Sequence, residues 1–158
     1  MTLLVPFDGS PLSEAALVRA SQFGTVLEEP VIAFSVIPRN NADYARDRSW
    51  IGTDESFDLE TIITHLRESV TALCPATEFR YEVVDRYAPT GTIAQRVRKL
   101  AKTLEATLVF IGSENAGRLV ASVSSVGRGV ATDDAYDVVI IRSRKPRTIA
   151  ALGDDNPR

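Results

Sequence analysis

The class of fold is set by Ala106–Ser143, which reads ATLVFIGSENAGRLVASVSSVGRGVATDDAYDVVIIRS. Near its start lies Thr107–Ile111, a short apolar run rich in β-branched residues that ends in Gly112-Ser113. Such a run is typical of a buried parallel strand that opens into a loop at its carboxyl end. The rest of the stretch predicts a helix over about 121–132 and a second strand over Asp137–Arg142.

The same alternation of strands and helices extends through the remainder of the chain. Further strands are predicted at Leu3–Phe7, Val31–Ile37 and Phe79–Val84. Helices are predicted after Ser10-Pro11, over 59–73 and after Pro89, where apolar residues recur at helical spacing. Strands that alternate with helices form a mostly parallel sheet covered on both faces. We therefore predict a Rossmann-like α/β fold, a three-layer αβα sandwich with a five-stranded, mostly parallel sheet.

A chain of 158 residues corresponds to one domain. We expect that domain to span residues 1–143, with 144–158 as a mobile C-terminal tail because no periodicity is present there. Residues 38–54 form a polar, irregular segment that is long for a connector. It contains Tyr44 and Trp50, and two interpretations stay open: a lid that folds over a ligand-binding crevice at the carboxyl ends of the strands, or a mobile loop.

The composition of the chain bears on which kinds of partner it can bind and in which cellular compartment we expect it. A net charge of −3 gives no general attraction to nucleic acid or to an anionic membrane. No window approaches the roughly 18 apolar residues of a membrane span, and the apolar opening Met1–Phe7 lacks a basic flank. The single cysteine, Cys74, excludes an internal disulfide and is expected to be buried. We expect a cytoplasmic protein.

The residue inventory does not specify an enzyme. With His65 as the only histidine and Cys74 as the only cysteine, the chain offers no thiolate–imidazole pair and no clustered Cys/His metal site. The Walker string GxxxxGK[ST] and the dinucleotide fingerprint GxGxxG are both absent. Slow ATP hydrolysis would need a water-activating group and Mg²⁺, and no residue is marked for either role. We expect neither catalysis nor a bound metal.

Phosphate binding remains open in the loop after Ile111. Gly112-Ser113-Glu114-Asn115-Ala116-Gly117 is followed by serines at the start of the next predicted helix. Glycines let backbone N–H groups turn towards a phosphate, and serine hydroxyls add donors. The same residues also suit an ordinary tight turn with serine caps.

The order of the chain resembles that of the universal stress protein family. The opening VPFDGSPLSEAAL is similar to the family's first strand, its aspartate and its helix start. The segment from Gly91 to Ser113 matches the third helix and fourth strand, while Ser125-Val126 and VVIIR match the last helix and strand. This resemblance covers about residues 2–143 and implies an adenine nucleotide alpha hydrolase-like fold.

Nucleotide-binding members of the family carry Gly-x2-Gly-x9-Gly-[Ser/Thr] after the fourth strand. Gly112 matches the first position, and Asn115 replaces the second glycine. The segment between Asn115 and the next predicted helix is one residue shorter than in the family pattern, so that Ser124-Ser125 stands where Gly-[Ser/Thr] is expected. Gly117, two residues after Asn115, offers an alternative turn. The serine pair resembles a subgroup that does not bind ATP. The resemblance thus implies lost or weakened nucleotide binding.

Two positions outside the loop also match nucleotide-contacting positions of the family. Asp8 matches the family residue that contacts adenosine, and its alternative role is to cap the following helix turn. Val36 matches a position whose backbone meets adenine, and its alternative role is strand core. The preferred interpretation is a non-enzymatic stress-response module that binds an unknown protein partner and has a degenerate nucleotide site. The alternative is an ATP or AMP binder lined by Asp8, Val36, Gly112, Asn115, Gly117, Ser124 and Ser125.

The resemblance also implies a homodimer, because the family commonly pairs its last strands across a two-fold axis. The interface residues would be Val138, Val139, Ile140 and Ile141. Pairing there hides an apolar edge that otherwise invites unwanted association. Where the family often has proline before this strand, the chain has Asp137.

Overall fold

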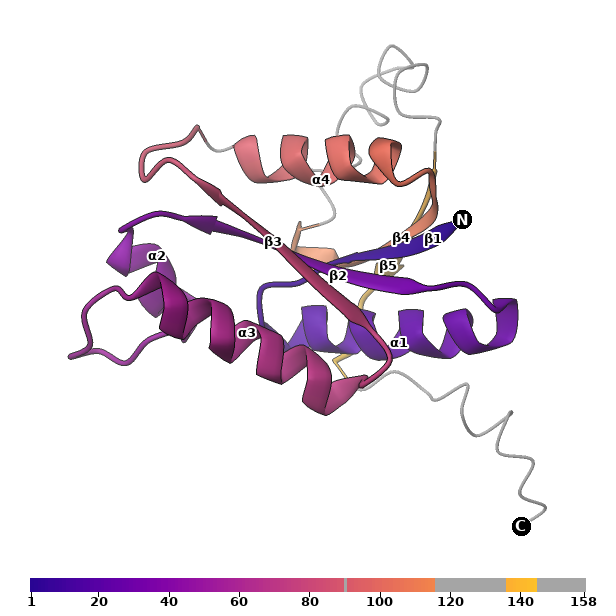
Figure 1. The fold of residues 1–158 in the computed structure, drawn as a ribbon, viewed down its shortest axis with the longest axis horizontal. Coiled ribbons are helices and arrows are strands. Elements are labelled where there is room, and N and C mark those ends of the chain that lie inside the picture. Colours follow the sequence, from indigo (N-terminus) through magenta and orange to yellow (C-terminus); the bar gives the residue numbers. More distant parts are fainter. Residues whose placement is uncertain (90, 116–135, 145–158) are drawn as a thin grey trace.

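The fold is built on a five-stranded sheet in a computed structural model that describes residues 1–89, 91–115 and 136–144 (Figure 1). The strands are β1 (Thr2–Pro6), β2 (Val31–Pro38), β3 (Glu78–Val84), β4 (Ala106–Gly112) and β5 (Asp137–Ile141). They are ordered β3-β2-β1-β4-β5, and every neighbouring pair is parallel. The predicted α/β class is confirmed, and the sheet is parallel throughout the described residues.

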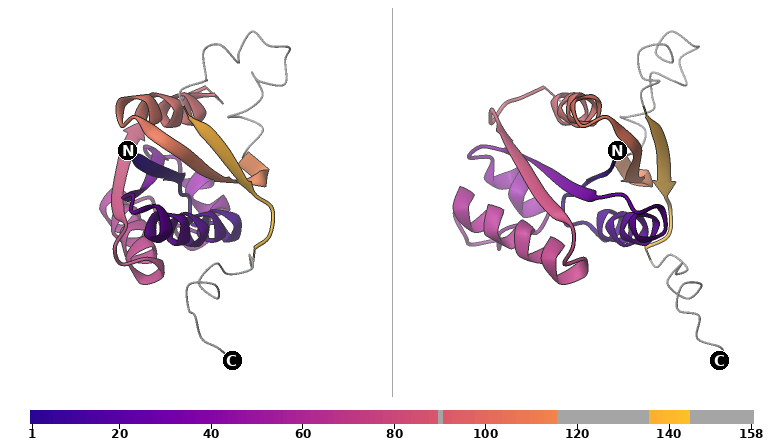
Figure 2. Two further views of the ribbon diagram at one scale, coloured as in Figure 1. Left: turned by 90° about the vertical axis from the view of Figure 1, so that its right-hand side faces the viewer. Right: turned by 45° about the vertical axis from the view of Figure 1, so that its right-hand side comes forward.

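Helices cover the two faces of this sheet. Helices α1 (Pro11–Leu27) and α3 (Leu59–Leu73) lie on one face, and α4 (Thr92–Thr103) lies on the other (Figures 1 and 2). A short additional helix, α2 (Ala42–Asp47), lies beside α3. The sheet and the two helical layers give the predicted sandwich.

The central strand β1 explains why this sequence must form a two-sided core. Leu3 and Leu4 are both fully buried, yet consecutive strand residues point to opposite faces. Leu3 packs in the cluster beneath α1 and α3, and Leu4 packs in the cluster beneath α4. A strand buried on both faces needs a continuous apolar run, which is the pattern that Leu3–Val5 provides.

The start of α1 follows from three consecutive residues. Ser10 accepts a hydrogen bond of 3.2 Å from the backbone N–H of Ser13, and Pro11 occupies the first helical position. The predicted cap is confirmed. Gly9 adopts φ +81°, a left-handed conformation that glycine reaches at little steric cost, and it turns the chain from β1 into this cap.

The interpretation of residues 38–54 as irregular is wrong. They contain α2, whose first turn is capped by the Asn41 side chain, which accepts a 3.0 Å hydrogen bond from the N–H of Tyr44. Ala45, Trp50 and Ile51 are buried in the same cluster as β1. Tertiary burial rather than local periodicity holds this segment, so the segment packs on the domain.

Two predictions fall on the parts of the chain that the structure leaves undescribed. The helix predicted over 121–132 lies outside the described residues, and so does the predicted tail beyond Arg144. Among the helices that are described, none has the length and apolar character needed to cross a bilayer.

Candidate functional site

The strand order changes direction next to β1, whose neighbours are β2 and β4. In open parallel sheets, ligands bind at such a point, beside the carboxyl ends of the strands. A pocket lies there, lined by Pro6, Phe7, Asp8, Phe34, Val36, Tyr44, Arg48, Ile93, Ala94, Val97, Ile111 and Asn115.

The inner part of this pocket is an apolar slot between the sheet and α4. Phe34 and Val36 come from β2, Ile111 comes from β4, and Ala94 and Val97 come from α4. All five side chains are buried. An apolar slot of this kind favours a flat, weakly polar ring over a charged group, because a charge loses its hydration there.

The outer part is polar, and we call it the mouth. It is lined by Asp8, Gly9, Ser10, Pro11, Asp47, Arg48, Ser49, Glu114 and Asn115. Asp8, Arg48 and Asn115 line both the slot and the mouth. The two hollows therefore adjoin, and we call the apolar slot and its charged mouth together the crevice.

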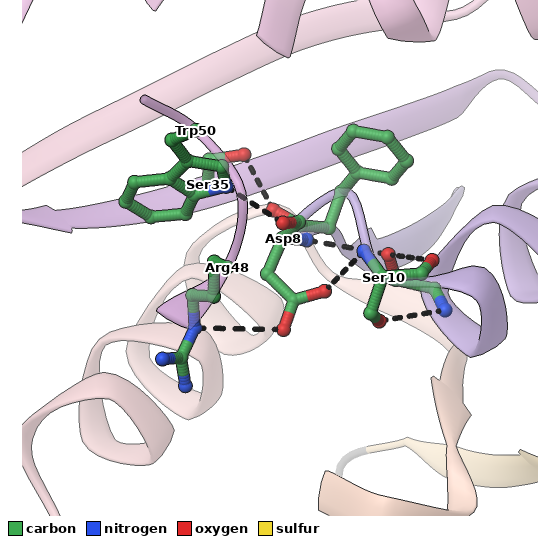
Figure 3. A network of polar contacts seen from close by, with 7 residues as sticks. Asp8, Ser10, Ser35, Arg48 and Trp50 are labelled. Carbon is green, nitrogen blue, oxygen red and sulfur yellow. Dashed lines mark hydrogen bonds and ion pairs between the residues drawn. The ribbon is translucent and has the colours of Figure 1, made fainter. Parts of the chain in front are cut away.

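Asp8 is held by hydrogen bonds on both sides of the turn after β1 (Figure 3). Its carboxylate oxygen Oδ1 accepts a 2.9 Å hydrogen bond from the N–H of Ser10. Its backbone carbonyl accepts one of 2.7 Å from the indole Nε1 of Trp50. The carboxylate thus stabilises the entry to α1 while its side chain, 23% exposed, still lines the crevice. The turn-capping role predicted for Asp8 is confirmed, and the same side chain lines the crevice.

Arg48 is the functional candidate that the sequence did not predict. Its Nε lies 3.8 Å from Oδ2 of Asp8 (Figure 3), and its guanidinium carbon lies 3.6 Å from the centroid of the Tyr44 ring. At that distance the arginine stacks on the aromatic face. No local pattern marks Arg48 among the charged residues of 38–54, because only the docking of α2 brings it to β1.

The structure describes four of the seven predicted site residues. Asp8, Val36 and Asn115 line the same pocket, and Gly112 lies at the end of β4. Gly117, Ser124 and Ser125 lie outside the described residues.

Gly112 has a packing role at the end of β4. A Cβ added to Gly112 would lie 2.8 Å from the Cβ of Leu12, closer than such atoms approach one another. Glycine at this position lets the first turn of α1 pack directly on β4. This contact accounts for the glycine whether or not a phosphate binds nearby.

The groups most often used in catalysis lie away from the crevice. His65 is exposed on α3, and Cys74 is buried at the carboxyl end of the same helix, as predicted. Burial raises the pKa of the Cys74 thiol, which makes the reactive thiolate scarcer. In the described part of the chain, no group of three or more His, Cys, Asp or Glu side chains could hold a metal ion.

The chain as a whole resembles known proteins in sequence and in fold. The model of the universal stress protein family matches residues 1–142. No curated protein sequence matches the chain.

Solved structures of 23 chains match the fold. A universal stress protein in complex with cAMP is 22% identical, with a TM-score of 0.54 over 90% of this chain and 96% of that one. The protein from Archaeoglobus fulgidus in complex with dAMP is 14% identical, with a TM-score of 0.53 over 89% and 96%. The one from Lactobacillus plantarum is 16% identical, with a TM-score of 0.54 over 90% and 97%.

Proposed function

The chain belongs to the universal stress protein family, and on this premise we propose that it is a non-enzymatic stress-response module that binds an adenine nucleotide in its crevice. The observation that carries the proposal is the apolar slot between the sheet and α4, which has the character that a purine ring requires. Two proteins of the same fold are described in complex with cAMP and with dAMP, and both of these ligands contain adenine.

The sequence of the loop after β4 favours weak rather than tight binding. Asn115 stands where nucleotide-binding relatives have glycine, and it lines both parts of the crevice. A side chain there takes up space in which the backbone would approach a phosphate closely. This observation keeps a second function in view, a protein-binding module that uses no nucleotide.

The absence of catalysis is part of the proposal. Among the residues that the structure describes, the charged groups that line the slot are Asp8 and Arg48, and they face each other. A hydrolase would have to position and activate a water molecule, whereas both carboxylate oxygens of Asp8 already face protein groups, Oδ1 the N–H of Ser10 and Oδ2 the guanidinium of Arg48. We propose a regulatory role in the cytoplasm, in which ligand occupancy changes the surface that a protein partner meets.

We also propose that the module is a homodimer through β5. This strand is an edge of the sheet in the described residues, and its Ile140 side chain is 44% exposed. Val138 and Val139 are half-buried, while Ile141 is buried. An apolar side chain on an open strand edge favours pairing with a second copy.

Thermal unfolding with adenosine, AMP, cAMP or ATP, each with and without Mg²⁺, tests nucleotide binding. A ligand that binds only the folded state stabilises it by RT ln(1 + [L]/Kd), so the melting temperature should rise with its concentration. Ala94→Leu should remove this rise, because Ala94 is a buried part of the slot wall. The control is Gln95→Leu, which places the same leucine side chain at an exposed position of the same helix. No rise at millimolar concentration with any of the four compounds would favour the protein-binding alternative.

A further inference from the structure

The charges at the mouth of the crevice restrict the ligand further. Three carboxylates line the mouth, those of Asp8, Asp47 and Glu114. Among the described residues that line it, Arg48 supplies the positive charge. A ligand group with several negative charges therefore meets more repulsion than attraction there, whereas a group with one or two charges can sit against Arg48.

Arg48 is only partly neutralised by Asp8. The 3.8 Å between Nε and the carboxylate exceeds the 2.7–2.9 Å of a charge-assisted hydrogen bond. The Nε atom is buried and has no hydrogen-bond partner. An arginine that makes no hydrogen bond to its carboxylate neighbour, and whose side chain is 25% exposed where the apolar slot meets the polar mouth, is suited to bind an anionic group of the ligand.

The position of Arg48 is set before any ligand arrives. Its guanidinium stacks on Tyr44, whose ring also contacts Trp50 edge to face at 5.6 Å. Trp50 is buried and hydrogen-bonded to Asp8. An arginine held in this way loses less conformational entropy on binding than one on a free loop.

We propose that Arg48 binds the single phosphate of a nucleoside monophosphate, open or cyclic, and that the carboxylates of the mouth discriminate against nucleoside triphosphates. The inference rests on the proposed nucleotide binding and names the ligand class of that same crevice. Arg48 is the residue that determines specificity, and Asp47 and Glu114 act on the ligand through their charge.

Isothermal titration with adenosine, AMP and Mg²⁺-free ATP at low and at high salt tests this inference. On the wild-type protein, AMP should bind on the order of tenfold more tightly than adenosine, as expected for one hydrogen-bonded charge pair. ATP should bind more weakly than AMP at low salt, and high salt should narrow that gap because it screens the exposed carboxylates of Asp47 and Glu114.

Three variants separate the contributions. Arg48→Gln should remove the difference between AMP and adenosine. Arg67→Gln, which deletes the same charge on the exposed surface of α3, should leave that difference intact. In the double variant Asp47→Asn, Glu114→Gln, the ratio of the Kd for ATP to the Kd for AMP should fall about two- to fivefold, which is the size of effect expected from exposed charges.

The outcomes distinguish this inference from the proposal beneath it. If adenosine and AMP bind equally well to the wild type, or if ATP binds as tightly as AMP at low salt, the role of Arg48 and the mouth is wrong while nucleotide binding stands. If none of the three compounds binds, both proposals fail. The wild-type comparison needs no variant, so a misfolded Arg48→Gln protein would not leave the inference undecided.

Discussion

The indole Nε1 of Trp50 lies 2.7 Å from the backbone carbonyl oxygen of Asp8, 42 residues earlier in the chain. This hydrogen bond joins the segment 38–54 to the end of the central strand. It thereby fixes two walls of the crevice to each other, the one that carries Arg48 and the one that carries the Asp8 carboxylate.

Removing the indole N–H of Trp50 should destabilise the fold. Trp50→Phe leaves the Asp8 carbonyl without its partner, and the loss should lower the free energy of unfolding by about 1–3 kcal/mol. Urea unfolding monitored by circular dichroism measures the change, with Tyr87→Phe as the control because Tyr87 is 78% exposed. A midpoint for Trp50→Phe equal to that of the control would show that the hydrogen bond contributes nothing to stability.

Trp50 also provides an optical probe of the crevice. It is the only tryptophan in the chain, so the intrinsic emission excited at the red edge reports on this one position. If ligand binding tightens the contact of Arg48 with Tyr44 and hence the surroundings of Trp50, adenine nucleotides should change the emission with the affinity found by calorimetry. Emission that stays constant at saturating ligand would place the binding site elsewhere.

Gly112→Ala should destabilise the fold through its contact with α1. The added Cβ meets the Cβ of Leu12 at 2.8 Å, and overpacking of this kind costs about 1–3 kcal/mol. Gly91→Ala is the matched control, since a Cβ at Gly91 meets nothing within 4 Å, and its effect should stay within about 0.5 kcal/mol. Equal stability of the two variants in chemical denaturation would contradict the packing role of Gly112.

Ile140→Glu should convert a homodimer into a monomer. The substitution places a charge on the exposed side chain of the edge strand β5, where pairing with a second copy would bury it. Tyr81→Glu is the control, because Tyr81 is 40% exposed on the opposite edge strand β3. Light scattering after gel filtration gives the mass of each variant. A monomeric wild type, or dissociation by Tyr81→Glu alone, would refute a β5 interface.

Stability should fall at alkaline pH because of Cys74. Burial holds the pKa of its thiol above the ordinary value of 9.0, so from that pH upwards the unfolded chain loses this proton while the folded chain retains it. The free energy of unfolding should then decrease by up to about 1.4 kcal/mol per pH unit until the folded thiol also ionises. Cys74→Ala removes this contribution. Parallel stability profiles of the two proteins above pH 9 would mean that the thiol ionises as readily when folded.

The sheet could be predicted because each of its strands has a recognisable local sequence pattern. Val31–Ile37 and Thr107–Ile111 are short apolar runs rich in β-branched residues, a pattern typical of a buried strand, and both are strands in the structure. Parallel strands bring their carboxyl ends to one edge. The meeting of Asp8, Val36 and Asn115 therefore followed from the fold class and the resemblance together.

The remaining lining of the crevice could not be read in the same way. The apolar face of α4 predicts an inward direction, but periodicity does not distinguish a core contact from the wall of a slot, and Val97 is both. Helix α2 has only six residues, too few for a periodic pattern, and buried tertiary contacts hold it in place. Arg48 depends on that docking. The close approach of Leu12, which requires a glycine at position 112, is likewise a property of the folded chain.

The strand order has a consequence for the nascent chain. Strand β1 precedes the other four described strands in the chain, and it pairs on one side with β2 and on the other with β4, which begins at Ala106. At about 5–20 residues per second, several seconds of synthesis separate the emergence of these two partners. Throughout that interval the hydrogen-bonding edge of an apolar central strand stands open. Early binding by a ribosome-associated chaperone would protect it until translation passes β4.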